Sequence, residues 1–334
     1  MKRQLLGVAA ILLSISTYAQ DNPLWMRYCA ISPDGTTIAF TYKGDIYTVP
    51  STGGRASQIT TNPAHDTKPI WSPDGKKIAF ASDRMGSMDI FEVNKEGGIP
   101  KRLTTHSGNE TPVAYKDAGH ILFLANIMPT VEDAQFPSGQ FQQVYEVNTE
   151  GGRPALFSSM PMEDISINHT GNTLLYHDKK GYEDPWRKHH TSSITRDIWL
   201  CSLNGNRTFR KQTTFNGEDR TPVWASDDKS FYYLSEEKGS FNIFKRDIDG
   251  NTSKQITNHT KHPVRFLSAA SNGTLCYGYD GEIYTVKEGA IPQKVQISIV
   301  TDKNDKDLIR QIKRSGATEI SLSPDAKEIA FEIG

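Results

Sequence analysis

The sequence predicts an all-β protein, a six-bladed β-propeller whose blades are four-stranded antiparallel sheets. One observation is a nearly literal repeat, because Ile31-Ser-Pro-Asp-Gly-Thr-Thr-Ile-Ala-Phe40 returns as Trp71-Ser-Pro-Asp-Gly-Lys-Lys-Ile-Ala-Phe80. A second is that this unit occurs six times, with looser wording in the later copies. A third is that each unit contains only short β-like runs and turns. Repeats of this kind are typical of propeller blades.

Each unit opens with an apolar run that ends at a turn. The turn carries proline to preset φ, aspartate to bond its own backbone, and glycine for a positive φ. The predicted first strands are residues 28–31, 69–71, 112–115, 164–167, 222–224 and 263–267. The predicted second strands are residues 38–41, 78–81, 121–125, 174–177, 231–234 and 275–278.

The second half of each unit reads as a hairpin. Predicted third strands are residues 46–49, 90–93, 144–147, 198–201, 243–245 and 283–286, and the fourth strands end at residues 59, 103, 156, 212, 256 and 295. Glycines, paired in the first three units, separate the two strands. The first unit starts with an innermost strand and the sixth ends with an outermost one. We therefore expect the ring to close by side-by-side packing of blades one and six, without strand exchange.

The N-terminus has the pattern of a secretory signal. Lys2 and Arg3 precede an apolar stretch at residues 5–15, and the small residue Ala19 offers a cleavage point. The residue directly after that point is not a cysteine, so a lipid anchor is not indicated. We expect an exported protein, in the bacterial periplasm or secreted, with no membrane association after cleavage. A net charge of −1 gives no reason to expect a nucleic-acid partner.

The chain divides into four predicted segments. They are a signal peptide at 1–19, a propeller at 24–297, a charged linker at 298–317 and the start of a second propeller at 318–334. The last segment contains Glu319-Ile-Ser-Leu-Ser-Pro-Asp-Ala-Lys-Glu-Ile-Ala-Phe331, a seventh copy of the repeat. Two strands cannot bury the faces of a blade alone, so we expect this chain to be part of a longer protein.

Motifs for chemistry are missing from the sequence. It contains no Gly-x-Ser-x-Gly elbow, no His-Glu-x-x-His, no Cys-x-x-Cys pair and no phosphate-binding glycine loop. The three cysteines, Cys29, Cys201 and Cys276, stand in three different repeats and suggest small buried residues, not a disulfide framework. We predict no catalytic residue, no metal site and no cofactor in this chain.

Candidate binding residues stand on a long insertion in the fourth unit, residues 178–197. Tyr182, Trp186 and Arg187, followed by His189 and His190, are of the types that bind a peptide or a partner domain when exposed together. The histidine pair alone is a poor metal signal. The alternative, of equal weight, is that Trp186 packs onto its own loop.

A second candidate stands at the matching corner of the second unit, at Asp83 and Arg84. These residues are binding candidates on a blade-corner loop. A structural salt bridge or a turn contact is the favoured interpretation.

The combination of Ser-Pro-Asp-Gly-x-x-Ile-Ala-Phe, Gly-Asp-Ile-Tyr-Thr-Val-Pro and Gly-Gly-x-x-x-x-Ile-Thr resembles the tricorn protease family, from about Leu24 to the end of the chain. The generic repeat is WD-like or TolB-like, and TolB-like and prolyl-oligopeptidase-like propellers share it. Three features favour tricorn: the first blade directly after the signal, the insertion Trp186-Arg-Lys-His-His-Thr-Ser-Ser193, and Ser315-Gly-Ala-Thr-Glu319 leading into new repeats.

The resemblance implies a long exported serine peptidase, in which a six-bladed propeller is followed by a seven-bladed one, a PDZ domain and catalytic domains. The propellers of such proteins gate peptides to and from the active site. Peptides and the downstream domains would then be the partners of this chain. The catalytic segments of the family have no counterpart here, so no catalytic residue is carried over.

Two alternatives remain open. A TolB-like periplasmic interaction protein would have no enzymatic activity, but it normally carries an α/β domain before the propeller. A prolyl-oligopeptidase-like enzyme would use the repeat at Glu319 as a seventh blade and continue into an α/β-hydrolase domain. The charged stretch at 298–314 interrupts such a ring and argues against it.

Overall fold

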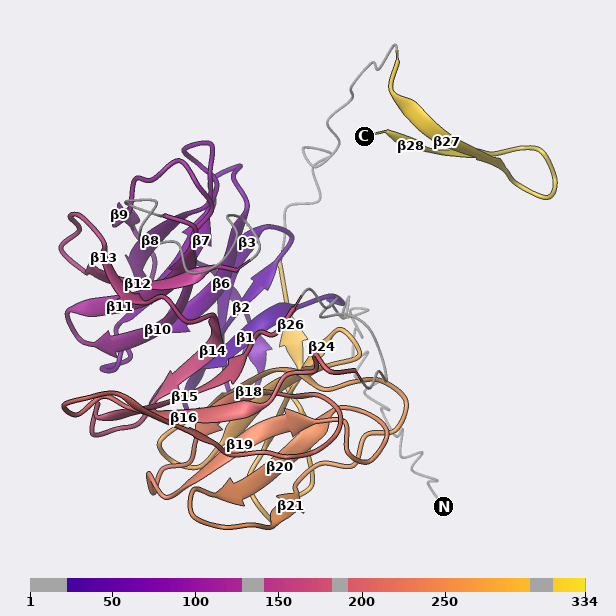
Figure 1. Cartoon of the computed structure of the whole chain (residues 1–334). Coiled ribbons are helices and arrows are strands. Elements are labelled where there is room, and N and C mark those ends of the chain that lie inside the picture. The colour runs from indigo at the N-terminus through magenta and orange to yellow at the C-terminus, as the bar shows by residue number, and fades with distance from the viewer. Residues whose placement is uncertain (1–22, 128–140, 182–191, 301–314, 334) are drawn as a thin grey trace, which may run out of the picture. The chain divides into compact units, whose positions relative to one another are not determined.

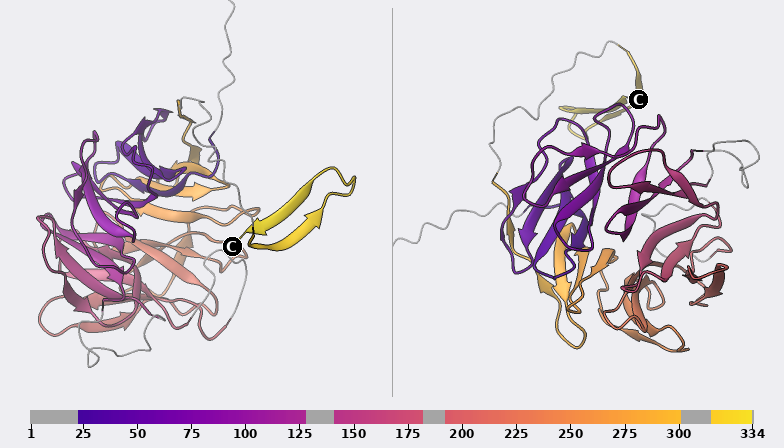
Figure 2. Two further views of the ribbon diagram at one scale, coloured as in Figure 1. Left: turned by 90° about the horizontal axis from the view of Figure 1, so that it is seen from above. Right: turned by 90° about the vertical axis from the view of Figure 1, so that its left-hand side faces the viewer.

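A computed structural model describes residues 23–127, 141–181, 192–300 and 315–333, and every regular element in them is a β-strand (Figure 1). Nowhere in these ranges does a helix occur that is long and apolar enough to cross a membrane. The chain forms two compact units, Met1–Ile299 and Val300–Gly334. The first unit contains the propeller, and its blades follow one another round a ring (Figure 2).

The first three blades each consist of four consecutive antiparallel strands. Blade one contains β1 (Arg27–Ile31), β2 (Thr37–Tyr42), β3 (Asp45–Pro50) and β5 (Ser57–Gln58). Blade two contains β6 (Asp66–Trp71), β7 (Lys77–Ser82), β8 (Asp89–Asn94) and β9 (Lys101–Arg102). Blade three contains β10 (Thr111–Asp117), β11 (His120–Ala125), β12 (Gln143–Asn148) and β13 (Ala155–Ser158).

The other three blades repeat this order. Blade four contains β14 (Met162–Ile167), β15 (Thr173–Asp178), β16 (Ile198–Ser202) and β17 (Thr208–Lys211). Blade five contains β18 (Asp219–Trp224), β19 (Ser230–Ser235), β20 (Asn242–Asp247) and β21 (Ser253–Gln255). Blade six contains β22 (Arg265–Ala269), β23 (Leu275–Tyr279), β24 (Glu282–Val286) and β25 (Gln293–Lys294). The six four-stranded blades predicted from the sequence are confirmed.

The first strand of blade six is shifted as a whole, whereas β10 and β13 each end two residues beyond the predicted ends at 115 and 156. The first strand of blade six is β22 at Arg265–Ala269, two residues after the predicted segment 263–267. The turn that follows reads Ser-Asn-Gly in place of Pro-Asp-Gly, so the usual marker of the strand end is missing. The turn is closed by the amide of Ala270, which donates to the carbonyl of Thr274 at 2.9 Å.

The turns after the first strands show why the repeat preserves its polar residues. In blade two, the hydroxyl of Ser72 donates to Asp74 Oδ1 at 2.7 Å and accepts from the amide of Lys77 at 2.9 Å. Gly75 takes a φ of +67°, which glycine adopts without steric cost. The side chains therefore satisfy backbone groups that the turn leaves without ladder partners.

A threonine after the fourth strand holds the third strand in four of the blades. Its hydroxyl accepts a hydrogen bond from the amide of the first apolar residue of the third strand, at 2.9–3.0 Å. The pairs are Thr60 with Ile46, Thr104 with Ile90, Thr213 with Ile198 and Thr257 with Ile243. In three of these blades the threonine follows Ile or Leu, and in blade four it follows Gln212.

The core lies between blades. Each of six apolar clusters joins two neighbouring blades, so every blade packs on both faces. Indole groups add polar links between neighbouring first strands. Trp71 Nε1 donates to the carbonyl of Ala30 at 2.9 Å, and Trp224 Nε1 donates to the carbonyl of Ser166 at 3.0 Å.

The ring closes through blade one and blade six, whose four-stranded sheets exchange no strand, as predicted. The closure has one further part that the sequence did not predict. After blade six, β26 (Ile297–Ser298) pairs in parallel with β4 (Gly54–Arg55), which stands in the sequence between β3 and β5 of blade one. The amide of Gly54 donates to the carbonyl of Gln296 at 2.8 Å, and that of Ala56 to Ser298 at 2.9 Å.

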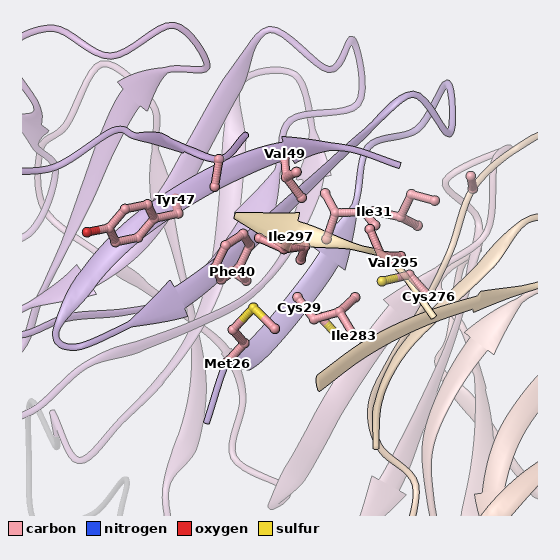
Figure 3. Packing of buried hydrophobic residues seen from close by; sticks show 13 residues of the cluster. Met26, Cys29, Ile31, Phe40, Tyr47, Val49, Cys276, Ile283, Val295 and Ile297 are labelled. Atoms are coloured by element: carbon pink, nitrogen blue, oxygen red, sulfur yellow. The ribbon is translucent and has the colours of Figure 1, made fainter. Parts of the chain in front are cut away.

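Apolar side chains accompany this parallel pair. Figure 3 shows Val295 and Ile297 among Ile31, Phe40 and Val49 of blade one, and all five are buried in one cluster. The neighbouring Gly53 has a φ of +92°, and a Cβ atom there would lie 2.6 Å from the carbonyl oxygen of Gln296. The close approach of the two segments therefore requires glycine at this position.

The second unit contains one hairpin among its described residues, made of β27 (Ala317–Leu322) and β28 (Ile329–Ile333). Its turn repeats the arrangement in the blades, since the hydroxyl of Ser323 donates to Asp325 Oδ1 at 2.7 Å. The apolar side chains of Ile320, Leu322 and Phe331 are exposed.

Candidate functional site

The first strands of five blades share an unusual backbone conformation. Tyr28, Lys68, Asp164, Thr221 and Phe266 stand at the same position of the repeat and have φ between +48° and +57°. Each lies at a bulge, where the register between the first and second strands shifts. A non-glycine residue in the left-handed region costs roughly 1–3 kcal/mol and is a frequent feature of functional sites.

Blade three departs from this pattern for a reason that the sequence contains. Tyr115 pairs with the second strand of blade three as Trp71 does in blade two, and with these two residues aligned Pro112 occupies the position of Lys68. The proline ring fixes φ near −65°, so this residue cannot take the left-handed conformation. The register of β10 is shifted after Pro112 all the same.

The bulges surround a cavity on the axis of the ring, with a volume of about 530 Å³. All six first strands contribute to its lining. The residues at the six equivalent positions all line it: Tyr28, Lys68, Pro112, Asp164, Thr221 and Phe266. Bulges re-aim side chains, and here they direct one residue of each blade toward the axis.

The lining is amphipathic with an excess of positive charge. Five basic side chains line the cavity, against two acidic ones, Glu163 and Asp164. The basic residues are Lys68, Lys179, Arg196, Arg220 and Arg265. A cavity of this size that combines apolar walls with a few charged groups fits the general description of a ligand-binding pocket.

Glu163 is the centre of a charged network on the side of blade four. Its carboxylate accepts from Lys179 Nζ at 2.7 Å and lies 3.3 Å from His177 Nε2 and 3.6 Å from Arg196 Nε. Burial acts to raise the pKa of Glu163, but the hydrogen bond and charge of His177, followed by those of Lys179, hold it below its usual range. Glu163 is therefore ionised and fully paired.

The network continues toward blade five. Arg196 Nη1 donates to Glu218 Oε1 at 2.6 Å, and Arg220 Nη1 lies 3.6 Å from the same oxygen. The guanidinium of Arg220 also lies 4.1 Å from the centre of the Phe241 ring. Burial lowers the pKa of Arg220 to about 10, so the group stays charged at neutral pH.

The opposite side of the cavity is aromatic. The rings of Tyr28 and Phe266 lie 4.8 Å apart, and Lys68 Nζ lies 5.7 Å from the centre of the Tyr28 ring. Burial lowers the pKa of Lys68, while the negative charges of Asp164 and Glu163 oppose that effect. The cavity thus has an aromatic side with one lysine and a side of paired charges.

The lining offers charged and apolar groups that can contact a bound ligand. Within the part of the chain that the structure describes, no three His, Cys, Asp or Glu side chains are grouped to hold a metal ion. The one histidine in the lining, His177, is held between Glu163 and the backbone amide of Thr221, which donates to Nδ1 at 3.3 Å.

The structure places Arg84 in a buried ion pair. Its Nη2 atom donates to both carboxylate oxygens of Asp66, at 2.9 and 2.8 Å, and its guanidinium lies 4.6 Å from the centre of the Phe91 ring. Asp83 accepts from the backbone amide of His65 at 2.7 Å. These contacts are of the structural kind favoured above, and a binding role for the two residues stays a prediction.

The other predicted binding residues lie outside the described residues. They are Tyr182, Trp186, Arg187, His189 and His190. Their predicted role is neither supported nor contradicted by the structure.

The cavity residues were not predicted as a site. A signal existed, because these residues stand at a fixed place in each repeat, three residues before Ile31, Trp71, Tyr115, Ile167, Trp224 and Ala269. Their identities differ from blade to blade, in contrast to the repeated apolar positions around them. Variation at one fixed place of a repeat indicates a position that does not serve the common core.

Comparisons with known proteins agree with the fold. Residues 23–290 match a family model described as the tricorn protease N-terminal beta propeller domain. Tricorn protease homolog 1 of Streptomyces coelicolor is 26% identical over 281 residues, which are 83% of this chain and 25% of that protein. The tricorn protease homolog of Saccharolobus solfataricus is also 26% identical, over 84% of this chain and 26% of its own length.

A solved structure is similar as well. The crystal structure of the tricorn protease matches with a TM-score of 0.73 at 21% identity, over 93% of this chain and 29% of that one. At this identity the likeness shows the fold. The chain spans about a quarter of the length of the curated relatives it matches.

Proposed function

The chain belongs to the family of tricorn protease N-terminal β-propeller domains, and we propose that it is the propeller region of a tricorn-like periplasmic serine peptidase. In this role it gates or docks peptides for a catalytic domain that lies outside these residues. The observation that carries the proposal is the axial cavity of about 530 Å³, to which all six blades contribute. A peptide that enters this cavity meets apolar walls, charged groups and backbone from several blades at once.

The chemistry of the lining suits a peptide. Peptides carry amide donors and acceptors, side chains of mixed polarity and charged ends, and the cavity offers an aromatic side, a paired-charge side and an excess of basic groups. The proposed partners are therefore peptide substrates and the other domains of the same protease. The proposal assigns no catalytic residue and no cofactor to this chain.

The second unit supports a continuation into further repeats. Its hairpin carries the Ser-Asp turn of the blades and exposes apolar side chains at Ile320, Leu322 and Phe331. A two-stranded hairpin cannot bury such a face by itself. In the proposed protein this hairpin begins a second propeller, and residues 298–317 link the two.

The proposal also places the protein in the periplasm. Its support is the pattern of basic residues, apolar stretch and small residue at positions 1–19. A cleaved signal would leave a mature protein that starts shortly before β1 (Arg27–Ile31).

The test is to isolate the native protein with an antibody raised against residues 24–297. Periplasm and cytoplasm of source cells are separated, and the captured protein is sized on a denaturing gel and assayed for peptide hydrolysis with and without a serine-directed inhibitor. The proposal expects a periplasmic band far above 37.3 kDa and inhibitor-sensitive hydrolysis. A band near that mass without hydrolysis would contradict it and favour a free-standing interaction module.

A further inference from the structure

We propose that the aromatic side of the axial cavity, formed by blades six, one and two, is a binding site for a carboxylate group, with Lys68 and Tyr28 as its donors. This inference rests on the proposed function, because it names the chemical group of the peptide that the cavity retains. The inference rests on the Lys68 ammonium and the Tyr28 hydroxyl, which line the cavity and have no hydrogen-bond acceptor among the described residues.

The same backbone feature, a β-bulge with a residue in the left-handed conformation, brings Lys68 and Tyr28 to the cavity. Each stands at a bulge of a first strand, with φ of +53° and +51°. Among the described residues, no acceptor lies within hydrogen-bond distance of Lys68 Nζ or of the Tyr28 hydroxyl. Both groups line the cavity, so a ligand held there can reach them.

Lys68 is half-buried, and no hydrogen bond from the protein replaces the contacts with water that this burial removes from its ammonium group. The cavity's own carboxylates do not provide one. Glu163 is hydrogen-bonded to Lys179, and Asp164 Oδ2 accepts from the hydroxyl of Thr221 at 2.7 Å. Their negative charges oppose the loss of the proton from Lys68, while the hydrogen-bonding positions around the ammonium remain available to a ligand.

The second donor complements the first. Burial raises the pKa of Tyr28, so its hydroxyl keeps its proton at neutral pH. The Lys68 ammonium and the Tyr28 ring are in contact, with 5.7 Å between the nitrogen and the ring centre. A carboxylate, which has two oxygens and only accepts, can take one hydrogen bond from each donor.

The surroundings suit the organic part of such a ligand. The ring of Phe266 packs on Tyr28 at 4.8 Å and lines the cavity beside Leu267. An apolar or aromatic side chain next to the bound carboxylate would contact these groups. Two sources supply a carboxylate on a peptide, the C-terminus and an Asp or Glu side chain, and both offer the same chemistry to Lys68.

Isothermal titration calorimetry of three short peptides against the purified chain tests the inference. The probes are tetra-alanine with a free C-terminus, the same peptide as its C-terminal amide, and acetyl-Ala-Ala-Asp-Ala-amide. The variants are Lys68→Met, Lys68→Arg and Tyr28→Phe. The matched control is Lys76→Met in the turn of the same blade, where the lysine side chain is 78% exposed.

A hydrogen bond to a charged group is worth enough to change affinity by about 10- to 100-fold. We expect a peptide with a carboxylate to bind that much more tightly than the amide. Lys68→Met should abolish the difference and Lys68→Arg should retain most of it. Tyr28→Phe should weaken carboxylate binding less than Lys68→Met, and Lys76→Met should leave binding unchanged. A thermal melt of each variant confirms that it is folded.

The outcomes separate the two proposals. If only tetra-alanine binds more tightly than its C-terminal amide, the bound group is the C-terminal carboxylate. If the aspartate peptide also binds more tightly than the amide, a side-chain carboxylate is bound as well. If all three peptides bind equally and Lys68→Met changes nothing, the carboxylate site is refuted while peptide binding by the cavity stands. If none of the peptides binds, both the carboxylate site and the passage of peptides through this cavity are refuted.

Discussion

Replacing Ile297 with alanine should weaken the closure of the ring. Ile297 follows blade six in the chain, yet its side chain is only 2% exposed and packs in the cluster that contains Ile31, Phe40 and Val49 of blade one (Figure 3). The substitution leaves the backbone bonds between β26 and β4 intact and removes only the buried part of the side chain. The result therefore measures the apolar contribution to the closure.

The expected magnitude follows from that burial. Burying an isoleucine side chain is worth about 1.5–3 kcal/mol, and the cavity left in a packed cluster adds to the loss. Ile→Ala in a core costs about 2–5 kcal/mol, and we expect this range for the free energy of unfolding. Urea denaturation of the chain, followed by tryptophan fluorescence and far-ultraviolet circular dichroism, gives the value.

The matched control is Ile291→Ala, because Ile291 stands six residues earlier and is 79% exposed. Its replacement should change the free energy of unfolding by less than about 0.5 kcal/mol. A loss below that limit for Ile297→Ala as well would show that the buried side chain of Ile297 adds nothing to the closure. The backbone bonds between β26 and β4 and the packing of blades one and six would then hold the ring without it.

Three further predictions concern buried polar groups. Arg84→Met should lower the free energy of unfolding by about 3–5 kcal/mol in urea denaturation, because it leaves the fully buried Asp66 without its partner. Adding Asp66→Asn should recover part of this loss, and an equal loss in the double variant would contradict the prediction. Burial raises the pKa of Glu110 to about 7, so folding takes up a proton there and the contribution of Glu110 to stability falls as pH rises from about 4.5 to 7. The free energy of unfolding, measured from pH 5 to 8, should therefore decline less with pH for Glu110→Gln than for the natural chain. Parallel profiles for the two proteins would refute the shift. Trp224→Phe removes the indole donor to the carbonyl of Ser166 in the neighbouring blade four. It should lower the free energy of unfolding by at least about 1 kcal/mol in thermal or urea unfolding, and an unchanged value would show that this hydrogen bond contributes nothing.

The architecture could be predicted from the sequence because the propeller repeats its local rules. The Ser-Pro-Asp-Gly turns and the threonines after the fourth strands satisfy backbone groups in the same way in several blades. The paired glycines close the turns between third and fourth strands. At β22, whose following turn lacks proline and aspartate, the predicted strand is displaced by two residues.

The closure and the cavity could not be predicted in the same way. The parallel pair of β26 and β4 is two residues long and joins segments more than 240 residues apart in the chain, so no local pattern indicates it. The cavity residues lie at bulges, and a bulge reverses the alternation from which strand faces are read. Lys68 and Phe266 stand at the same position of the repeat and both line the cavity, but neither residue type alone predicts a bulge that faces the axis.

Mapping where a peptide lies on the protein tests the central claim most directly. A short peptide carrying benzoylphenylalanine is irradiated with the purified chain, and the cross-linked residues are identified by mass spectrometry. The account predicts cross-links on the axial lining, at Tyr28, Val113 and Phe266 on first strands of three different blades, and their suppression by excess unlabelled peptide. Cross-links confined to the outer strands of the blades would contradict the claim that the axial cavity receives peptides.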